Sequence, residues 1–240
     1  MTHKLFISAH SNALPSTTTD EPFMLQSING ETDNLQVKKV LCGGQFAMVW
    51  LDDGHVWFIG RNNYGQMGLG DENDRHQFTR LDPQEYHNER IIDVDTGEYS
   101  SCIITEGGKF YGTGWNGHCH CGHAESENTR FRESKKTFPE YDFVYMGYSH
   151  TIVVNNGVEM WGIGQNLNGQ LGLGHCRNIS EFTLLNDESS PLYNMKIKQV
   201  SLGAYHTIVL TAGNELYVSG KNEQGQLVCS TSTFMHERDY

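Results

Sequence analysis

Charged residues and proline are scarce in this chain of 240 residues: charged side chains make up 19%, and there are five prolines against 26 glycines. Disordered chains are rich in charge and proline, so this composition favours a folded protein with many tight turns. No apolar stretch is long enough to cross a bilayer, and the first residues lack the apolar core of a signal peptide. We therefore expect a cytoplasmic or nuclear protein with no membrane partner.

Basic residues are also few, with 17 Lys and Arg against 29 Asp and Glu and a net charge of −12. An acidic body repels phosphate backbones, so we expect no direct nucleic-acid binding. The sequence has no Gly-x-Ser-x-Gly elbow, no P-loop and no His-Glu-x-x-His motif. We therefore expect no catalytic residues, no covalent catalysis and no cofactor.

One segment contains the residue types that bind zinc, the run from His118 to His123 with Cys119, His120 and Cys121 between them. Alternate residues of an extended loop rarely converge on one ion, and no second cysteine pair lies at zinc-finger spacing. We expect no metal site here.

The dominant feature of the sequence is a repeat marked by two sets of glycines. The first set is Gly44, Gly97, Gly147 and Gly203, at intervals of 53, 50 and 56 residues. The second set is Gly60, Gly114, Gly164 and Gly220, at intervals of 54, 50 and 56 residues. Two markers that advance together indicate a structural unit of about 50 residues, which is typical of propellers and solenoids.

Each unit predicts a pair of antiparallel strands. The first strands are apolar throughout, as expected of inner strands covered on both faces: residues 46–51, 101–105, 150–154 and 206–210. Tight-turn pairs follow them at 53–54, 107–108, 156–157 and 213–214. The second strands return at 55–59, 109–111, 158–161 and 215–218 and end at Gly-x-Asn. Asn62, Asn116, Asn166 and Asn222 in these triplets are interpreted as turn formers that bond their own backbone.

The order of these motifs resembles the regulator of chromosome condensation repeat: Gly-x-x-His-Thr, a turn, an apolar-aromatic strand, then Gly-x-Asn-x-x-Gly-Gln-Leu-Gly. The third unit, from Gly147 through His150 and Thr151 to Gly174, is a nearly complete match, and the fourth, from Gly203 to Leu227, is close to it. The first unit has Ala47-Met48 in place of His-Thr. The second has Ser100-Ser101 there and lacks Gly-Gln-Leu-Gly. The resemblance covers residues 37 to 230 and implies an all-β propeller of four-stranded blades.

The chain holds four complete units and an N-terminal half unit. We predict a half repeat at 1–36, in which Lys4–Ala9 reads like Glu215–Gly220, and repeats at 37–90, 91–140, 141–195 and 196–240. Family propellers have seven blades, so three outcomes stay open. The chain is a fragment of a larger propeller, an open arc, or half of a ring completed by a second copy in a homodimer. We expect an open or partner-completed arc, because an open arc leaves strand edges that invite pairing.

The resemblance implies a protein-protein interaction scaffold, since propeller loops form a broad docking surface. The alternative that it implies is guanine nucleotide exchange on a small Ran-like GTPase, which would then be the partner protein. The candidate contact residues are Tyr99, Trp115, Tyr148, His150, Tyr205 and His206. Packing between blades is the competing interpretation of the aromatic residues. For the two His-Thr pairs, recurrence at one repeat position favours a structural role over partner contacts or acid-base chemistry.

Overall fold

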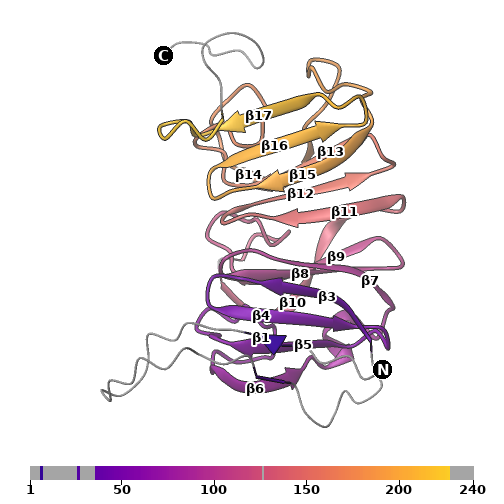
Figure 1. Ribbon diagram of the computed structural model, residues 1–240, viewed down its shortest axis with the longest axis vertical. Helices are drawn as coiled ribbons and strands as arrows, with labels where there is room; N and C mark the ends of the chain where they lie inside the picture. Colours follow the sequence, from indigo (N-terminus) through magenta and orange to yellow (C-terminus); the bar gives the residue numbers. More distant parts are fainter. Residues whose placement is uncertain (1–5, 8–25, 28–35, 126, 228–240) are drawn as a thin grey trace.

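The computed structural model describes residues 6–7, 26–27, 36–125 and 127–227, and almost all of its regular structure is β-strand. Four antiparallel sheets, here called blades 1 to 4, are stacked along the long axis (Figure 1). Within the described ranges the only helix is the short 3-10 turn η1 (Pro83–Tyr86), and no helix there is long and apolar enough to span a membrane. The all-β architecture expected from the repeat is confirmed.

Each blade is built from consecutive strands. Blade 1 contains β3 (Val37–Cys42), β4 (Phe46–Leu51), β5 (Val56–Gly60) and β6 (Arg75–Arg80). Blade 2 contains β7 (Ile91–Thr96), β8 (Ser100–Thr105), β9 (Lys109–Trp115) and β10 (Glu127–Thr137). Blade 3 contains β11 (Tyr141–Met146), β12 (His150–Asn155), β13 (Glu159–Gly164) and β14 (Ile179–Leu184). Blade 4 contains β15 (Ile197–Leu202), β16 (His206–Thr211) and β17 (Leu216–Gly220). A separate pair is formed by β1 (Phe6–Ile7) and β2 (Gln26–Ser27), and the other residues of the predicted half repeat, Gln36 excepted, lie outside the described ranges.

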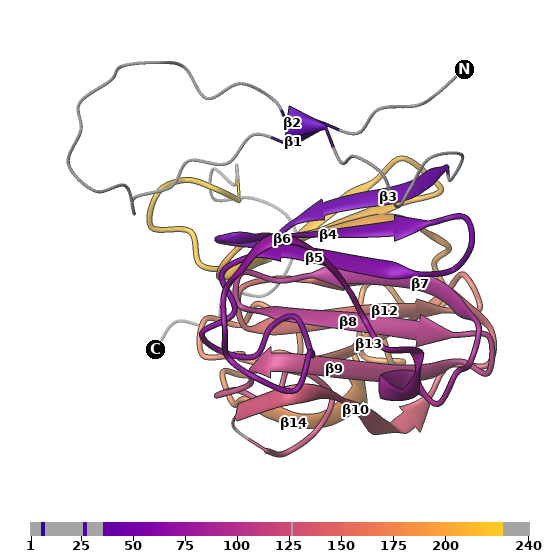
Figure 2. The same cartoon turned by 90° about the horizontal axis from the view of Figure 1, so that it is seen from below.

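The strands predicted to be inner strands are the second strand of each blade, and each has a strand on either side. Neighbouring blades contact one another through β3, β7, β11 and β15, which precede the first glycine of each unit. Figure 2 shows β3, β4 and β5 side by side, in this order, in blade 1. β3 has no buried residue, and β7 and β15 have two each, so these first strands lack the continuous apolar signal of a covered strand.

The second strands do have the burial that their composition predicts. Every residue of β4, β8 and β12 is buried, because each of these strands has a strand on either side and is covered on both faces. In β16 buried and half-buried residues alternate. One face of β16 packs on blade 3, and the other face points away from it.

The first landmark of the repeat in blade 1 is Gly43 and not Gly44. The amide of Gly43 donates to the Phe46 carbonyl at 2.9 Å, as Gly97, Gly147 and Gly203 donate to the third residue after them. With Gly43 in place, the first landmark advances by 54, 50 and 56 residues, the same intervals as the second. Because Gly43 and Gly44 are adjacent, the sequence alone did not show which of them is the equivalent of Gly97, Gly147 and Gly203.

Apolar side chains fill each joint between blades, in three clusters that contain residues from both sides. Each joint also contains one buried hydroxyl, here called the joint hydroxyl, near the start of the second strand. Ser101 Oγ donates to the Gln66 carbonyl at 2.7 Å, and Thr151 Oγ1 donates to the His120 carbonyl at 2.8 Å. Thr207 Oγ1 donates to the carbonyl of Gln170 at 2.7 Å. The loop after Gly-x-Asn in one blade is thereby bonded to the next blade.

We expect Thr207→Val to destabilise the folded protein by about 1–3 kcal/mol, the usual cost of an unsatisfied buried polar group. Valine keeps the shape of threonine but removes the hydroxyl that meets the His150 ring, and it leaves the Gln170 carbonyl with only the bond from Ser219 Oγ at 3.1 Å. Chemical denaturation measures the loss. Thr183→Val, at an exposed strand position, is the matched control and should change the stability little; equal effects of both substitutions would contradict the role of the joint hydroxyl.

Candidate protein-interaction surface

Aromatic side chains from successive blades form a row at one end of the strands. Tyr99, Tyr148 and Tyr205 lie in the connections between the first two strands of blades 2, 3 and 4. Trp115 is the last residue of β9, and Tyr64 lies in the loop after β5. We call these five residues the aromatic row.

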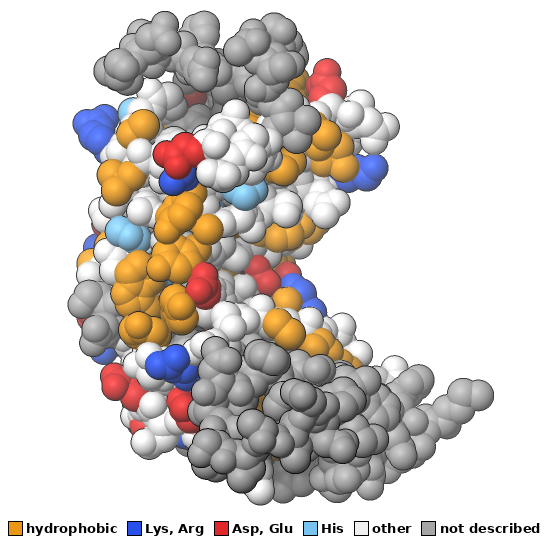
Figure 3. Space-filling model, turned by 60° about the vertical axis from the view of Figure 1, so that its left-hand side comes forward, with side chains coloured by type: hydrophobic (Ala, Val, Ile, Leu, Met, Phe, Trp, Pro, Cys, Tyr) orange, Lys and Arg blue, Asp and Glu red, His pale blue; other side chains and the backbone are white. Residues whose placement is uncertain are grey.

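Neighbouring rings of the row are in contact. The ring centroids of Tyr64 and Tyr99 are 5.1 Å apart, those of Tyr99 and Tyr148 are 6.1 Å apart, and those of Tyr148 and Tyr205 are 5.8 Å apart. The Trp115 ring lies 5.9 Å from Tyr148. These separations are typical of aromatic pairs. All five residues are only partly buried, and Figure 3 shows hydrophobic side chains gathered in a strip along the arc.

In blades 2 and 4, a glycine near the end of the third strand allows a backbone hydrogen bond to a tyrosine of the row. Gly114 has φ +99°, and a Cβ atom there would lie 2.4 Å from the Tyr99 carbonyl oxygen. This close approach lets the Trp115 amide donate to the Tyr99 carbonyl at 2.9 Å. In blade 4, the amide after Gly220 makes the same bond to Tyr205 at 2.8 Å. The backbone of Tyr99 and that of Tyr205 are therefore fixed in the same way, each against the third strand of its blade.

The phenol groups of Tyr99 and Tyr148 stay protonated at neutral pH, because the pKa of each is raised. A hydrogen bond to Glu98, together with burial, raises the pKa of Tyr99. Burial and the neighbouring phenol of Tyr205 raise the pKa of Tyr148. Lys221 Nζ lies 5.8 Å from the centre of the Tyr205 ring. Tyr99 and Tyr148 thus offer apolar ring faces together with neutral hydroxyl donors, which is the chemistry of aromatic anchors in protein interfaces.

The two histidines of the predicted contact set lie away from the row. His150 is fully buried between blades 3 and 4, and its Nε2 is 3.1 Å from Thr207 Oγ1. Burial lowers the pKa of His150 to about 4, so the ring is neutral at physiological pH. His206 is half-buried on the face of blade 4 that points away from blade 3. Sequence reasoning missed Tyr64, because the equivalent loop positions do not carry a tyrosine and the repeat therefore gives no signal.

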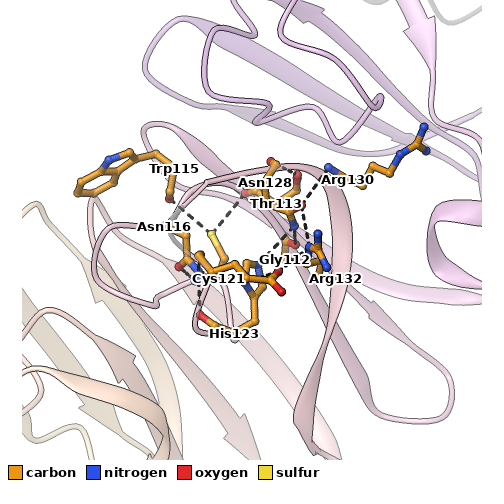
Figure 4. Close-up of polar contacts among 10 residues, drawn as sticks. Gly112, Thr113, Trp115, Asn116, Cys121, His123, Asn128, Arg130 and Arg132 are labelled. Atoms are coloured by element: carbon orange, nitrogen blue, oxygen red, sulfur yellow. Dashed lines mark hydrogen bonds and ion pairs between the residues drawn. The ribbon is translucent and has the colours of Figure 1, made fainter.

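The Gly-x-Asn asparagines close the loops that follow them. Asn116 Oδ1 accepts a hydrogen bond from the Cys121 amide at 2.8 Å, and its Nδ2 donates to the His123 carbonyl at 2.8 Å. Figure 4 shows Asn116 enclosed by this loop. Asn62 and Asn166 make the same pair of contacts in their own loops. The interpretation of these asparagines as turn formers is confirmed.

The His118–His123 segment replaces the Gly-Gln-Leu-Gly loop in blade 2. Cys121 is buried at the leucine position, and its Sγ contacts the carbonyl oxygens of Thr113 and Trp115 at 3.4 and 3.6 Å. His120 occupies the glutamine position, and its Nε2 lies 3.2 Å from Ser100 Oγ. Among the described residues no group of three or more His, Cys, Asp or Glu side chains is arranged to hold a metal ion.

A polar cluster joins the innermost strands of blades 1, 2 and 3. Lys39 Nζ pairs with Asp93 Oδ1 at 2.8 Å, and the Tyr141 hydroxyl donates to the other oxygen of Asp93. Asp95 Oδ2 accepts a hydrogen bond from the Met146 amide at 2.7 Å. Burial raises the pKa of Asp95 to about 6. All of these groups bond to one another or to the backbone, so the cluster connects blades and is not a candidate catalytic site.

Comparison with known proteins agrees with the repeat. The model of the regulator of chromosome condensation (RCC1) repeat matches residues 53–104 and 159–210, and a second model of that description matches 197–226. The ultraviolet-B receptor UVR8 of Arabidopsis thaliana is 30% identical over 208 residues, which are 86% of this chain and 45% of that protein. The human E3 ubiquitin-protein ligase HERC2 is 23% identical over 90% of this chain and 4% of its own length.

Solved structures show the same fold. Human WBSCR16 superimposes with a TM-score of 0.68 at 20% identity, over 82% of this chain and 50% of that one. Yeast RCC1 (Prp20), in a complex with Kap60, superimposes with a TM-score of 0.67 at 13% identity, over 82% of this chain and 46% of that one. The four blades thus correspond to a partial arc of the propeller. The chain spans about half the length of UVR8, WBSCR16 and yeast RCC1.

Proposed function

The chain belongs to the regulator of chromosome condensation repeat family, and from that premise we propose that it is a protein-protein interaction scaffold whose docking surface is the aromatic row. The observation that carries the proposal is the unbroken contact of five partly exposed rings across all four blades. Monomeric surfaces seldom present large contiguous apolar patches unless they are used for binding. Tyrosine and tryptophan are also the residues that most often dominate binding energy in interfaces.

The names of the similar proteins support binding and leave the partner open. One solved relative is described in complex with Kap60, and another is described by its binding to Gsp1p and histones. The relatives also include a light receptor, a ubiquitin ligase and a protein kinase. The same repeat occurs in proteins with such different activities. Membership of the family therefore supports a docking role for this chain more strongly than it supports any particular reaction.

Substitution of the two central rings tests this proposal. Trp115→Ala and Tyr148→Ala each remove a ring that contacts another ring of the row. Proteins that co-purify with the tagged wild-type chain are identified by quantitative mass spectrometry, and the affinity of the strongest one is then measured with purified components. We expect at least a tenfold loss of affinity for each substitution, as for an interface hot spot.

The matched control is Tyr193→Ala. Tyr193 is 44% exposed and lies between β14 and β15, outside the row. Its substitution should leave the affinity unchanged. If the Tyr193 variant loses the partner and the Trp115 and Tyr148 variants keep it, the docking surface is elsewhere. Thermal unfolding of each variant separates a loss of binding from a loss of folding.

A further inference from the structure

The aromatic row is long and narrow, which limits what can dock on it. Its four tyrosine rings follow one another in single file, with centroid separations of 5.1, 6.1 and 5.8 Å. The fifth ring, Trp115, lies beside this file against Tyr148. Because neighbouring rings are already in contact, a partner side chain cannot enter between them without separating them. We therefore expect a docked segment to lie along the row and to contact the rings in succession.

The backbone around the row distinguishes between the common ways of binding a peptide. Strand addition needs a free strand edge. The row is formed by connections between strands and by the end of β9, so no strand edge runs along it within the described ranges. A helix bonds its backbone carbonyls internally, so these carbonyls cannot accept from the N–H and O–H groups of the row. A polyproline II segment has no internal hydrogen bonds, and its carbonyls are free to accept.

The donors and the spacing of the row match a polyproline II segment. Among the described residues, the Trp115 indole N–H and the hydroxyls of Tyr148 and Tyr205 have no hydrogen-bond acceptor, so they are available to a partner. Two residues of polyproline II advance about 6.2 Å. The centroids of Tyr99, Tyr148 and Tyr205 are separated by 6.1 and 5.8 Å. Such a segment therefore passes one ring about every two residues.

A carboxylate, that of Glu98, places negative charge within the row. The Tyr99 side chain is hydrogen-bonded to Glu98, and Glu98 also contributes to the raised pKa of Tyr148, after burial and the phenol of Tyr205. No cation in the described part of the chain forms an ion pair with Glu98. Lys221, beside Tyr205, is already paired with Glu223 at 2.8 Å. A basic residue of the docked segment would complement Glu98, and the ring faces beside it attract a guanidinium group.

We propose that the aromatic row binds a proline-rich segment of the partner, which lies in the polyproline II conformation and carries a basic residue opposite Glu98. This inference rests on the proposed function, since it names the kind of segment that the row docks. The net charge of −12 also favours a basic segment over an acidic one. Proline fixes φ, so such a segment loses little conformational entropy when it docks.

A synthetic peptide of six prolines flanked on each side by arginine tests the proposal with the full chain. Six prolines span roughly 19 Å, enough to cross the three ring steps from Tyr64 to Tyr205. The peptide is titrated into the protein, and the NMR signal of the Trp115 indole N–H, identified by its loss in Trp115→Phe, reports binding. We expect a saturable shift of this signal. A peptide with the same arginines and a Gly-Ser spacer of equal length should bind at least tenfold more weakly, because it loses more conformational entropy and lacks the proline rings.

Substitutions in the protein show which part of the row and which charge are used. Tyr148→Ala should weaken the proline peptide at least tenfold, and Tyr193→Ala should leave its affinity unchanged. Glu98→Gln should weaken it by about two- to fivefold at low salt, as for an exposed ion pair, and should leave a hexaproline peptide with serine flanks unaffected. Glu188→Gln, at an exposed position between β14 and β15, is the matched control and should change neither affinity.

Three results would overturn the inference: no shift with the proline peptide, equal binding of the proline and Gly-Ser peptides, or equal effects of Glu98→Gln and Glu188→Gln. Its failure is distinguishable from failure of the scaffold function. A partner that loses affinity for the Trp115→Ala and Tyr148→Ala variants, but docks through a segment without proline, overturns the polyproline II inference and leaves the docking surface in place. A partner that binds both variants as tightly as the wild type contradicts the docking surface itself, and the inference fails with it.

Discussion

Acidification from pH 6.5 to pH 4 is expected to destabilise the folded protein by about 3 kcal/mol for each of two buried histidines. Burial lowers the pKa of His120 to about 3 and that of His150 to about 4, from an ordinary value of 6.5. Both rings are fully buried, and neither Nδ1 atom has a hydrogen-bond partner. The unfolded chain binds protons more readily than the folded one in this window. The contribution of these two neutral histidines to the free energy of unfolding is therefore complete above pH 6.5 and is lost as the pH falls.

Replacement of His120 by glutamine should remove about half of this acid sensitivity. The same loop position in blades 1 and 3 is held by Gln66 and Gln170, both fully buried, so glutamine fits the loop. The carbonyl that receives the Thr151 hydroxyl belongs to the backbone and is kept. The measurement is the free energy of unfolding by denaturant at several pH values from 4 to 7.

His76→Gln is the control, since His76 is exposed on β6. Its pH profile should match that of the wild type. A wild-type profile that stays flat between pH 6.5 and 4, or a His120→Gln profile as steep as the wild-type one, would contradict the burial of a neutral His120 at this joint.

The second large effect comes from Asp95, which stabilises the folded protein as the pH falls. Burial raises the pKa of Asp95 to about 6, from an ordinary value of 3.8. The folded state therefore holds a proton that the unfolded state releases, and this contribution is present below pH 3.8 and lost as the pH rises through 6. At pH 8 the ionised carboxylate should cost roughly 2–3 kcal/mol of stability. In the wild type this trend partly offsets the histidine effect on acidification.

Asp95→Asn should increase the stability at pH 8 by most of this amount and change it little at pH 4. The asparagine oxygen can still accept the bond from the Met146 amide. Glu72→Gln, at an exposed loop position, is the control for loss of an acidic charge and should have little effect at either pH. A destabilised Asp95→Asn variant at pH 8 would mean that attraction to Lys39 exceeds the desolvation of the carboxylate.

The regular half of the fold follows from local sequence signals. The second strands are apolar because both of their faces are covered, and the turns need the positive φ found at Gly54, Gly108, Asn156 and Asn214. The innermost strands gave no such signal, because β3 has no buried residue and β7 has only two. A covered strand is thus recognisable from its own residues, whereas a strand that lines the arc is recognisable only from its neighbours.

The interaction surface could be predicted only in part. Tyr99, Trp115, Tyr148 and Tyr205 stand out because they flank the glycine landmarks, and the structure brings them into one row. His150 belongs to a joint because its partner Thr207 lies 57 residues away, a contact that only the stacking of blades creates. Nucleotide exchange on a Ran-like GTPase stays a prediction, to be measured as release of labelled nucleotide from the GTPase.

Site-specific photo-crosslinking in cells tests the central claim most directly. A photoreactive phenylalanine analogue is placed at Tyr148 in one full-length protein and at Tyr193 in another, and the crosslinked products are identified by mass spectrometry. A protein partner docked on the aromatic row should be captured from position 148 and not from position 193. Capture of the same partner from position 193 alone would contradict the assignment of the row as the docking surface.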